Sequence, residues 1–328
     1  MATYDETKNE HDSGGESTVP TPICRPLPDG GEVWRLPNGR LHRLDGPAVI
    51  RPNGNEGWYF DGELHREGGP ARTLTSRGVQ EWYDHWQLHR DGGPAAVHKT
   101  GYQAWYDHDL LHRVGGPAVT WPDGKRAWYD QGRHHRVGGP AVTWPDGSQE
   151  WWVEDELHRD GGPAVTGNDG YEAWYDHGLL HRENGPAILE TSGNQYWYKH
   201  GLRHREDGPA VIKTNGWEAW YNNGELHRTG DQPAITYPDG TQEWYKHGQH
   251  HRAGDQPATI SPDGSMSWHK HGQTHRDADQ PATVDADGSR YWYKHGQLHR
   301  EGGPAVVMAD GETLWYSEGQ LIDPPATD

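Results

Sequence analysis

The sequence has few of the residues that build a thick apolar core. Of its 328 residues, 31% are hydrophobic and Phe60 is the one phenylalanine, whereas ordinary domains are about 45–50% apolar. The chain contains no apolar run long enough to span a bilayer. Its first residues also lack the basic and apolar segments of a signal peptide. We therefore expect no transmembrane segment and a cytoplasmic protein, or a virion component.

Cysteine and positive charge are also scarce. Cys24 is the single cysteine, which excludes an internal disulfide framework. The 49 acidic residues outnumber the 30 Lys and Arg residues, and the formal net charge is −19. Nucleic acids and anionic bilayers bind positive surfaces, so this charge argues against both as partners.

Catalytic signatures are missing as well. The sequence holds no G-x-S-x-G elbow, no phosphate-binding Walker loop and no H-E-x-x-H zinc motif. Chemistry needs one unique constellation of side chains, whereas this chain repeats near-identical segments. We therefore expect neither enzymatic activity nor a cofactor.

What the chain does have is a repeat. His-Arg dipeptides recur twelve times at spacings of 23 or 24 residues, and each is preceded by a Trp and followed by Pro-Ala five or six residues later. They begin at His42, His65, His89, His112, His135, His158, His181, His204, His227, His251, His275 and His299. Self-similarity at such a period is typical of an array in which each copy packs on its neighbours.

Two kinds of turn alternate within each copy and predict the fold class. Pro-Asp-Gly, as at Pro122–Gly124, suits a tight hairpin turn, and a second turn of the His-Gly or Asn-Gly kind follows Trp-Tyr. We predict an all-β, elongated array of antiparallel β-hairpins, a single-layer twisted sheet with about two strands per repeat. The segment from Leu-His-Arg to Gly-Pro is then an ordered connection. A parallel solenoid with one coil per repeat is the alternative.

The repeat also sets the expected domain limits. Residues 1–30 are rich in Asp, Glu, Ser, Gly and Pro without apolar periodicity, which predicts a disordered acidic leader or a docking arm. About twelve copies fill residues 31–322. Residues 323–328 form a C-terminal tail.

Adjacent Trp and Tyr point to opposite faces of a strand, and we expect Trp to occupy the packed face. The tyrosines are then candidates for binding a partner: Tyr106, Tyr129, Tyr175, Tyr198, Tyr221 and Tyr245. The His-Arg pairs are expected to form a structural ladder, represented by His112, Arg113, His135, Arg136, His158, Arg159, His181, Arg182, His204 and Arg205.

The same ladder argues against a metal site. With two strands per repeat, equivalent imidazoles of successive copies lie about 9–10 Å apart, too far to share an ion at bonds of about 2 Å. A second set of histidines follows Trp-Tyr, as at His85 and His200, and is expected to be solvated turn residues. We therefore predict no metal.

The period, the Asp-Gly turn, the Trp and the following His-Gly or Asn-Gly turn resemble MORN β-hairpin repeats over residues 31 to about 320. This chain carries Trp-Tyr and His-Arg-x-x-Gly-Pro-Ala as a variant of that pattern. The resemblance implies a noncatalytic scaffold that holds a protein partner over an extended surface. A homodimer is a further candidate for the partner. A weaker similarity to choline-binding cell-wall repeats leaves a glycan-binding module of phage or cell-surface type as the alternative.

Overall fold

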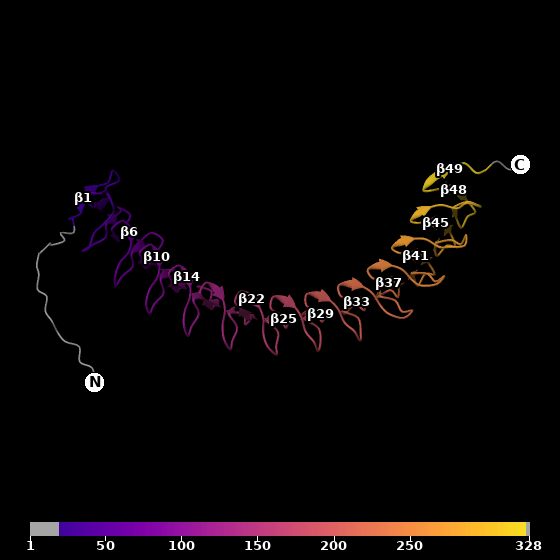
Figure 1. The fold of residues 1–328 in the computed structure, drawn as a ribbon, viewed down its shortest axis with the longest axis horizontal. Helices are drawn as coiled ribbons and strands as arrows, with labels where there is room; N and C mark the ends of the chain where they lie inside the picture. Colours follow the sequence, from indigo (N-terminus) through magenta and orange to yellow (C-terminus); the bar gives the residue numbers. More distant parts are fainter. Residues whose placement is uncertain (1–19, 326–328) are drawn as a thin grey trace, which may run out of the picture. The chain divides into compact units, whose positions relative to one another are not determined.

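The computed structural model describes residues 20–325, and every regular element in that part is a β-strand. The chain divides into two compact units between Gly132 and Arg133. Twenty-seven strands pair in antiparallel ladders of hairpins, which confirms the predicted all-β array (Figure 1). None of the described residues belongs to a helix that could cross a membrane.

In the first unit the ladder strands pair antiparallel in chain order. A parallel solenoid is thereby excluded for this unit. The strands are β1 (Ile23–Pro26), β2 (Glu32–Arg35), β3 (Val49–Ile50), β4 (Glu56–Gly57), β7 (Arg72–Leu74), β8 (Val79–Glu81), β11 (Ala96–His98), β12 (Gln103–Ala104), β15 (Val119–Thr120) and β16 (Arg126–Ala127).

The second unit continues the same pattern of antiparallel pairs. Its ladder strands are β19 (Val142–Thr143), β20 (Gln149–Glu150), β23 (Val165–Thr166), β24 (Glu172–Ala173), β27 (Ile188–Leu189), β28 (Gln195–Tyr196), β31 (Val211–Ile212), β32 (Glu218–Ala219), β35 (Ile235–Thr236), β36 (Gln242–Glu243), β39 (Thr259–Ile260), β40 (Met266–Ser267), β43 (Thr283–Val284), β44 (Arg290–Tyr291), β47 (Val306–Val307), β48 (Thr313–Ser317) and β49 (Gln320–Ile322).

Each repeat also contains a second, very short hairpin. The prediction of about two strands per repeat assigned this part of the chain to an ordered connecting segment. In the first unit these strands are β5 (Tyr59–Phe60), β6 (Glu63–Leu64), β9 (Tyr83–Asp84), β10 (Gln87–Leu88), β13 (Tyr106–Asp107), β14 (Leu110–Leu111) and β17 (Tyr129–Asp130). In the second they are β18 (Arg133–His134), β21 (Trp152–Val153), β22 (Glu156–Leu157), β25 (Tyr175–Asp176), β26 (Leu179–Leu180), β29 (Tyr198–Lys199), β30 (Leu202–Arg203), β33 (Tyr221–Asn222), β34 (Glu225–Leu226), β37 (Tyr245–Lys246), β38 (Gln249–His250), β41 (His269–Lys270), β42 (Gln273–Thr274), β45 (Tyr293–Lys294) and β46 (Gln297–Leu298).

The repeated Trp is the point at which the chain leaves the ladder and enters the short hairpin. The backbone N–H of Trp174 donates to the carbonyl of Ala187 on the ladder side (2.7 Å). Its own carbonyl accepts the N–H of His181 on the hairpin side (3.1 Å). One residue thus belongs to both hydrogen-bonding patterns, so the strand changes direction there without leaving polar backbone groups unpaired.

The two turns are formed as their residues predict. At Pro122–Gly124 the N–H of Gly124 donates to the carbonyl of Trp121, and Gly124 has φ +93°. The short hairpins turn through two consecutive residues of positive φ, such as His177 (45°) and Gly178 (76°). Two positive φ values are typical of the type I′ turn, whose twist matches that of a hairpin.

The core is thin and rests on alanine. The Ala of each Pro-Ala is fully buried in all twelve copies: Ala48, Ala71, Ala95, Ala118, Ala141, Ala164, Ala187, Ala210, Ala234, Ala258, Ala282 and Ala305. A second buried Ala, such as Ala219, pairs with Val211 and Ile235 on the neighbouring strands. Half-buried Tyr221 and Tyr245 pack against this group. The low aliphatic content is therefore sufficient, because aromatic rings cover small side chains.

The array begins earlier than residue 31. Strand β1 starts at Ile23 and pairs with β2, because Pro28, Asp29 and Gly30 form one more hairpin turn. The prediction of a disordered leader up to residue 30 is wrong for this segment. Residues 1–19, which hold most of the predicted leader, and residues 326–328 of the predicted tail lie outside the described part of the chain.

The close packing around Ala219 predicts intolerance of a larger side chain. Ala219→Leu should lower the free energy of unfolding by about 1–3 kcal/mol, because the inserted carbons have no space between Val211 and Ile235. Val137→Ala is the control, since Val137 is 88% exposed, and it should change stability by less than about 0.5 kcal/mol. Urea unfolding of both variants measures the difference. Equal stability of the two would contradict the assignment of Ala219 to the core.

Candidate functional site

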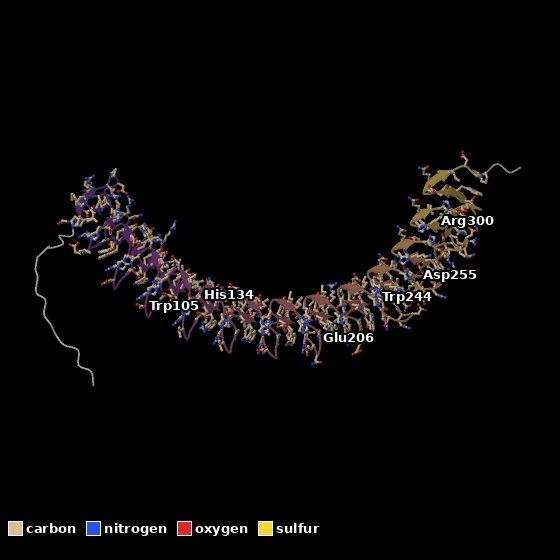
Figure 2. All side chains as sticks on the ribbon, viewed as in Figure 1. Trp105, His134, Glu206, Trp244, Asp255 and Arg300 are labelled. Carbon is tan, nitrogen blue, oxygen red and sulfur yellow. The ribbon has the colours of Figure 1, made fainter. Side chains whose placement is uncertain are left out.

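The arginine of the His-Arg pair stacks on the tryptophan of the same repeat. The guanidinium carbon lies 3.6–4.0 Å from the centre of the indole ring in eleven described contacts. Trp105 and Trp244, both labelled in Figure 2, each hold such an arginine. A cation over an indole face is stabilising by about 0.5–2 kcal/mol, depending on its exposure to water. The guanidinium group thus stacks on an indole ring of its own repeat.

The Gly-Pro of the motif closes around the same guanidinium group. Arg205 donates from Nη1 to the carbonyl of Pro209 (3.2 Å). A Cβ atom on Gly208 would lie 2.6 Å from the guanidinium carbon of Arg205. A side chain at this position would therefore displace the guanidinium group. Arg, Gly and Pro together shape the loop that connects the short hairpin to the next ladder strand.

In three repeats near the C-terminal end, the loop between His-Arg and Pro-Ala is one residue longer than in the other repeats. In each longer loop an aspartate bonds to the arginine of the following repeat. Asp255 forms two hydrogen bonds with Arg276 of the following repeat, at 2.6 and 2.7 Å. Asp231 with Arg252 and Asp279 with Arg300 repeat this arrangement. The Arg276 hydrogen bonds hold the pKa of Asp255 below its ordinary value.

The histidine of the His-Arg pair joins successive repeats along the hairpin row. His181 accepts, at Nδ1, the backbone N–H of His200 in the turn of the next repeat (3.2 Å). Nine such bonds are present in the described residues. Each turn Gly adds a further bond, as from Gly201 N–H to the carbonyl of Leu180 (2.8 Å). These bonds run from one repeat to the next, and the structural role of the His-Arg pairs stays a prediction.

The turn histidines are not simply solvated. All seven lie against the His-Arg imidazole of the preceding repeat, with ring centres 4.2–5.2 Å apart; five pairs are stacked, and His65–His85 and His158–His177 are tilted. The pairs are His65–His85, His89–His108, His158–His177, His181–His200, His227–His247, His251–His271 and His275–His295. Sequence spacing did not reveal these pairs, because only the type I′ turn brings its first residue over the ring of the previous copy.

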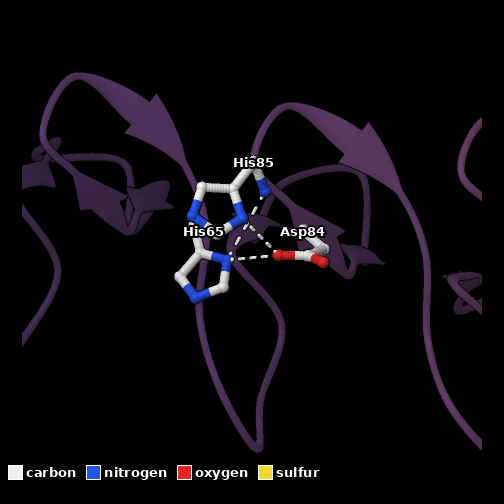
Figure 3. Close-up of side chains that lie close together, drawn as sticks. All are labelled: His65, Asp84 and His85. Carbon is white, nitrogen blue, oxygen red and sulfur yellow. Dashed lines mark hydrogen bonds and ion pairs between the residues drawn. The ribbon is translucent and has the colours of Figure 1, made fainter.

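In three copies an aspartate lies beside the imidazole pair. Asp84 Oδ1 lies 2.9 Å from His65 Nδ1 and 2.6 Å from His85 Nδ1 (Figure 3). His89, Asp107 and His108 form a second cluster, and His158, Asp176 and His177 form a third. The hydrogen bond from His177 holds the pKa of Asp176 below its usual range, and His108 does the same for Asp107.

Grooves recur between the His-Arg loops of successive repeats. One of about 660 Å³ is lined by Arg182, Trp197, Tyr198, His204, Arg205 and Glu206. Equivalent grooves of about 490 and 370 Å³ follow in the second unit. The first unit has one of about 390 Å³, lined by Arg43, Trp58, Tyr59 and Arg66 among others. Arg, Trp, His and an acidic residue line all four of these grooves, so a ligand meets similar chemistry in each of them.

The six candidate tyrosines lie in the short hairpins and are half-buried, with Tyr198 lining the groove just described. Tyr106 and Tyr129 pack against the buried Ala104 and Val119 of the first unit. Burial raises the pKa of Tyr106, Tyr175 and Tyr245. The tyrosines therefore contribute to packing as well as to the groove walls, because the strand turns at Trp and brings Tyr back over the ladder.

No family model matches the sequence, and a search of curated proteins finds no match. Among solved structures, 14 chains match. One is the wild-type TCP10 domain of Danio rerio CPAP in complex with a peptide of Danio rerio STIL, with 14% sequence identity. The match covers 90% of this chain and 97% of that chain at a TM-score of 0.13. A similarity at this TM-score supports no argument about fold or function.

The contact between Gly208 and Arg205 predicts a non-additive pair of substitutions. Gly208→Ala should displace the guanidinium group from Trp197 and lower the free energy of unfolding by about 1 kcal/mol, as should Arg205→Ala. The double variant should be no less stable than Arg205→Ala, because the new methyl group then has no arginine to displace. Gly302→Ala is the control, since nothing lies within 4 Å of its Cβ position. Additive losses of unfolding free energy, measured in urea, would contradict the packing of Arg205 between Trp197 and Gly208.

The Asp–Arg pairs between repeats predict a pH-dependent contribution to stability. The pKa of Asp255 is lowered from 3.8 by Arg276, so the contribution is fully present above that value and is lost as the pH falls through the lowered pKa. Asp255→Asn should therefore reduce the melting temperature at neutral pH, and its difference from the unaltered protein should disappear in strong acid. Asp207→Asn, in the shorter loop of the His204 repeat, is the control. A difference that does not change with pH would contradict this interpretation.

Proposed function

We propose that this protein is a noncatalytic repeat scaffold that binds a protein partner across several repeats. The observation that carries the proposal is the series of grooves with the same residue types, each formed by two neighbouring repeats. Repeat arrays generate long binding surfaces of this kind, in which affinity is spread over many contacts. A long segment of a partner chain that contacts several grooves is the ligand that suits this spacing.

The charge of the grooves indicates the chemistry of that partner. Arg182 and Arg205 are stacked on tryptophans within their repeats, whereas Glu206 at the edge of the same groove is 75% exposed. Asp160 and Glu301 on equivalent loops are also highly exposed. Glu206 and Glu301 also lie 3.9 and 3.2 Å from Lys199 and Lys294 of their own repeats. The excess of acidic groups, with a net charge of −19, favours a partner that carries lysine and arginine side chains. Aromatic groove walls favour apolar or aromatic anchors between those charges.

The alternative of a glycan-binding module has less support from the site. Carbohydrate recognition of the expected kind needs Trp and Tyr exposed together, whereas an arginine covers one face of Trp174 and of Trp197. Tyr175 and Tyr198 are half-buried beside them. A catalytic function also has less support, because the polar groups of the grooves recur in several copies and most already pair within the array.

We retain the similarity to MORN repeats as part of this proposal. It rests on the period of 23 or 24 residues, the Asp-Gly turn and the second Gly-containing turn after the Trp. MORN proteins are scaffolds for partner proteins, which agrees with the grooves. A homodimer, in which the partner is a second copy, is tested by the same experiment.

The proposal predicts that binding depends on the number of repeats. The unaltered chain should retain a specific protein from its native host, identified by mass spectrometry. Deletion of residues 151–196 removes two repeats in register and should leave the remainder folded, because each repeat packs only on its neighbours. The affinity for the identified partner should fall progressively with each pair of repeats removed, and it should weaken with added salt because the loops are acidic.

Charge reversal tests the groove directly. Glu206→Lys combined with Glu183→Lys should weaken binding of the purified partner, whereas Val137→Ala, at an exposed site outside the described grooves, should not. Glycan-array binding that is selective and is abolished by Tyr175→Ala with Tyr198→Ala would instead support the carbohydrate alternative. Absence of any partner, together with such glycan binding, would refute the protein scaffold.

A further inference from the structure

Three clusters of two imidazoles and one carboxylate stand out among the described side chains. Their ligand atoms all lie within 4.8 Å of one another: His65, Asp84 and His85; His89, Asp107 and His108; and His158, Asp176 and His177. In each cluster the first histidine comes from the His-Arg pair of one repeat. The aspartate and second histidine come from the short hairpin of the next repeat (Figure 3).

We propose that each of these clusters binds a divalent transition-metal ion of the zinc, nickel and cobalt class, and that the ion links two successive repeats. Two neutral imidazole nitrogens and a carboxylate oxygen are ligands that these ions prefer. The side chains of Asp84 and His85 are 41% and 53% exposed, so water can complete the coordination. The net charge of −19 attracts cations to the surface.

The geometry requires only a small movement to accept an ion. Both Nδ1 atoms of a cluster converge on the same carboxylate oxygen, at 3.2 and 2.6 Å in the His89 cluster and at 3.1 and 2.7 Å in the His158 cluster. Ligand atoms around a tetrahedral ion are roughly 3.3 Å apart, given metal bonds of about 2.0–2.2 Å. A half-exposed aspartate reaches that separation by rotating its side chain.

One nitrogen of the His89 cluster lacks a hydrogen bond. Nδ1 of His89 is buried and makes no hydrogen bond of good geometry to any residue described, although Asp107 Oδ1 lies 3.2 Å away. A buried polar atom without a partner costs stability, and a metal ion would satisfy it. In the other two clusters the corresponding nitrogen accepts a long N–H contact, of 3.4 Å in His65 and 3.3 Å in His158, and lies 2.9 and 3.1 Å from the carboxylate oxygen.

A second carboxylate faces the outer nitrogen of two of these histidines. Nε2 of His89 lies 3.3 Å from Asp91, and Nε2 of His158 lies 3.3 Å from Asp160. Metal-ligating histidines typically donate their other N–H to a carboxylate, which fixes the tautomer that leaves the first nitrogen free for the metal. The loop residue that follows His-Arg in these copies supplies that carboxylate.

The chain contains its own comparison sites. Four other imidazole pairs have lysine in place of the aspartate, at Lys199, Lys246, Lys270 and Lys294 beside His200, His247, His271 and His295. An ammonium group repels a cation and offers no lone pair. The prediction of no metal rested on the distance between equivalent His-Arg imidazoles of successive repeats. Each cluster instead joins a His-Arg imidazole to a turn imidazole, so that distance does not apply to it.

The test uses the full-length protein without a histidine tag. Zinc is titrated by calorimetry, and cobalt by its visible absorption, which reports imidazole and carboxylate coordination. The unaltered protein should take up three ions, one for each cluster. The variant Asp84→Asn, Asp107→Asn, Asp176→Asn should lose at least about tenfold in affinity at every site. The matched control His200→Asn, His247→Asn, His295→Asn should bind as the unaltered protein does.

A gain of binding completes the test. Lys199→Asp places a carboxylate beside His181 and His200 and should add one further ion to the stoichiometry. Circular dichroism confirms that each variant is folded. Failure of the unaltered protein to bind at millimolar zinc would overturn the proposal. So would full binding by the triple asparagine variant, since dispersed surface histidines would then be the ligands, or a Lys199→Asp variant that gains no ion.

Discussion

In nine repeats the guanidinium group of the His-Arg arginine lies close to a glycine of the following loop, and where its ring contact is described it also stacks on an indole ring. In the His204 repeat, Arg205 covers Trp197, approaches Gly208 where no side chain is present, and donates to the carbonyl of Pro209. The contact closes the loop between the short hairpin and the next ladder strand. It thereby sets where the buried Ala210 enters the core, and it holds the adjacent histidine against the following repeat.

Because each repeat buries little apolar surface, contacts between neighbours carry much of the stability. Successive repeats are joined by ladder pairing and, on the hairpin row, by one bond from the second turn residue to the preceding copy, as from Gly224 N–H to the carbonyl of Arg203 or from Trp86 N–H to that of Leu64. The copies then differ in what they add. Early repeats and the His158 repeat place an aspartate between two imidazoles, whereas the loops with an inserted residue place one against an arginine. Such local differences allow nearly identical repeats to acquire separate properties without disturbing the array.

The aromatic side chains that cover the core also form part of the surface. Half-buried Tyr and Trp rings cover the alanine core and also form the walls of grooves between the loops, so packing and recognition share residues such as Trp197 and Tyr198. The side chains of loop acids such as Glu206 and Glu301 are 75% and 79% exposed. An acidic surface with aromatic grooves at regular intervals follows, which is the basis for the partner chemistry we propose.

The sequence by itself determined the all-β class, the period and both turn positions, because these depend on local backbone preferences and on residue types that recur in every copy. The tertiary structure alone decided which side chains of neighbouring repeats contact one another. The strand turns at Trp174 because its N–H and carbonyl serve two different partners, and this brings Tyr175 back over the ladder. It also places His177 over His158, 19 residues earlier, with Asp176 beside both. Periodicity relates equivalent residues of successive copies, but these contacts join non-equivalent residues, so only the folded path of the chain defines them.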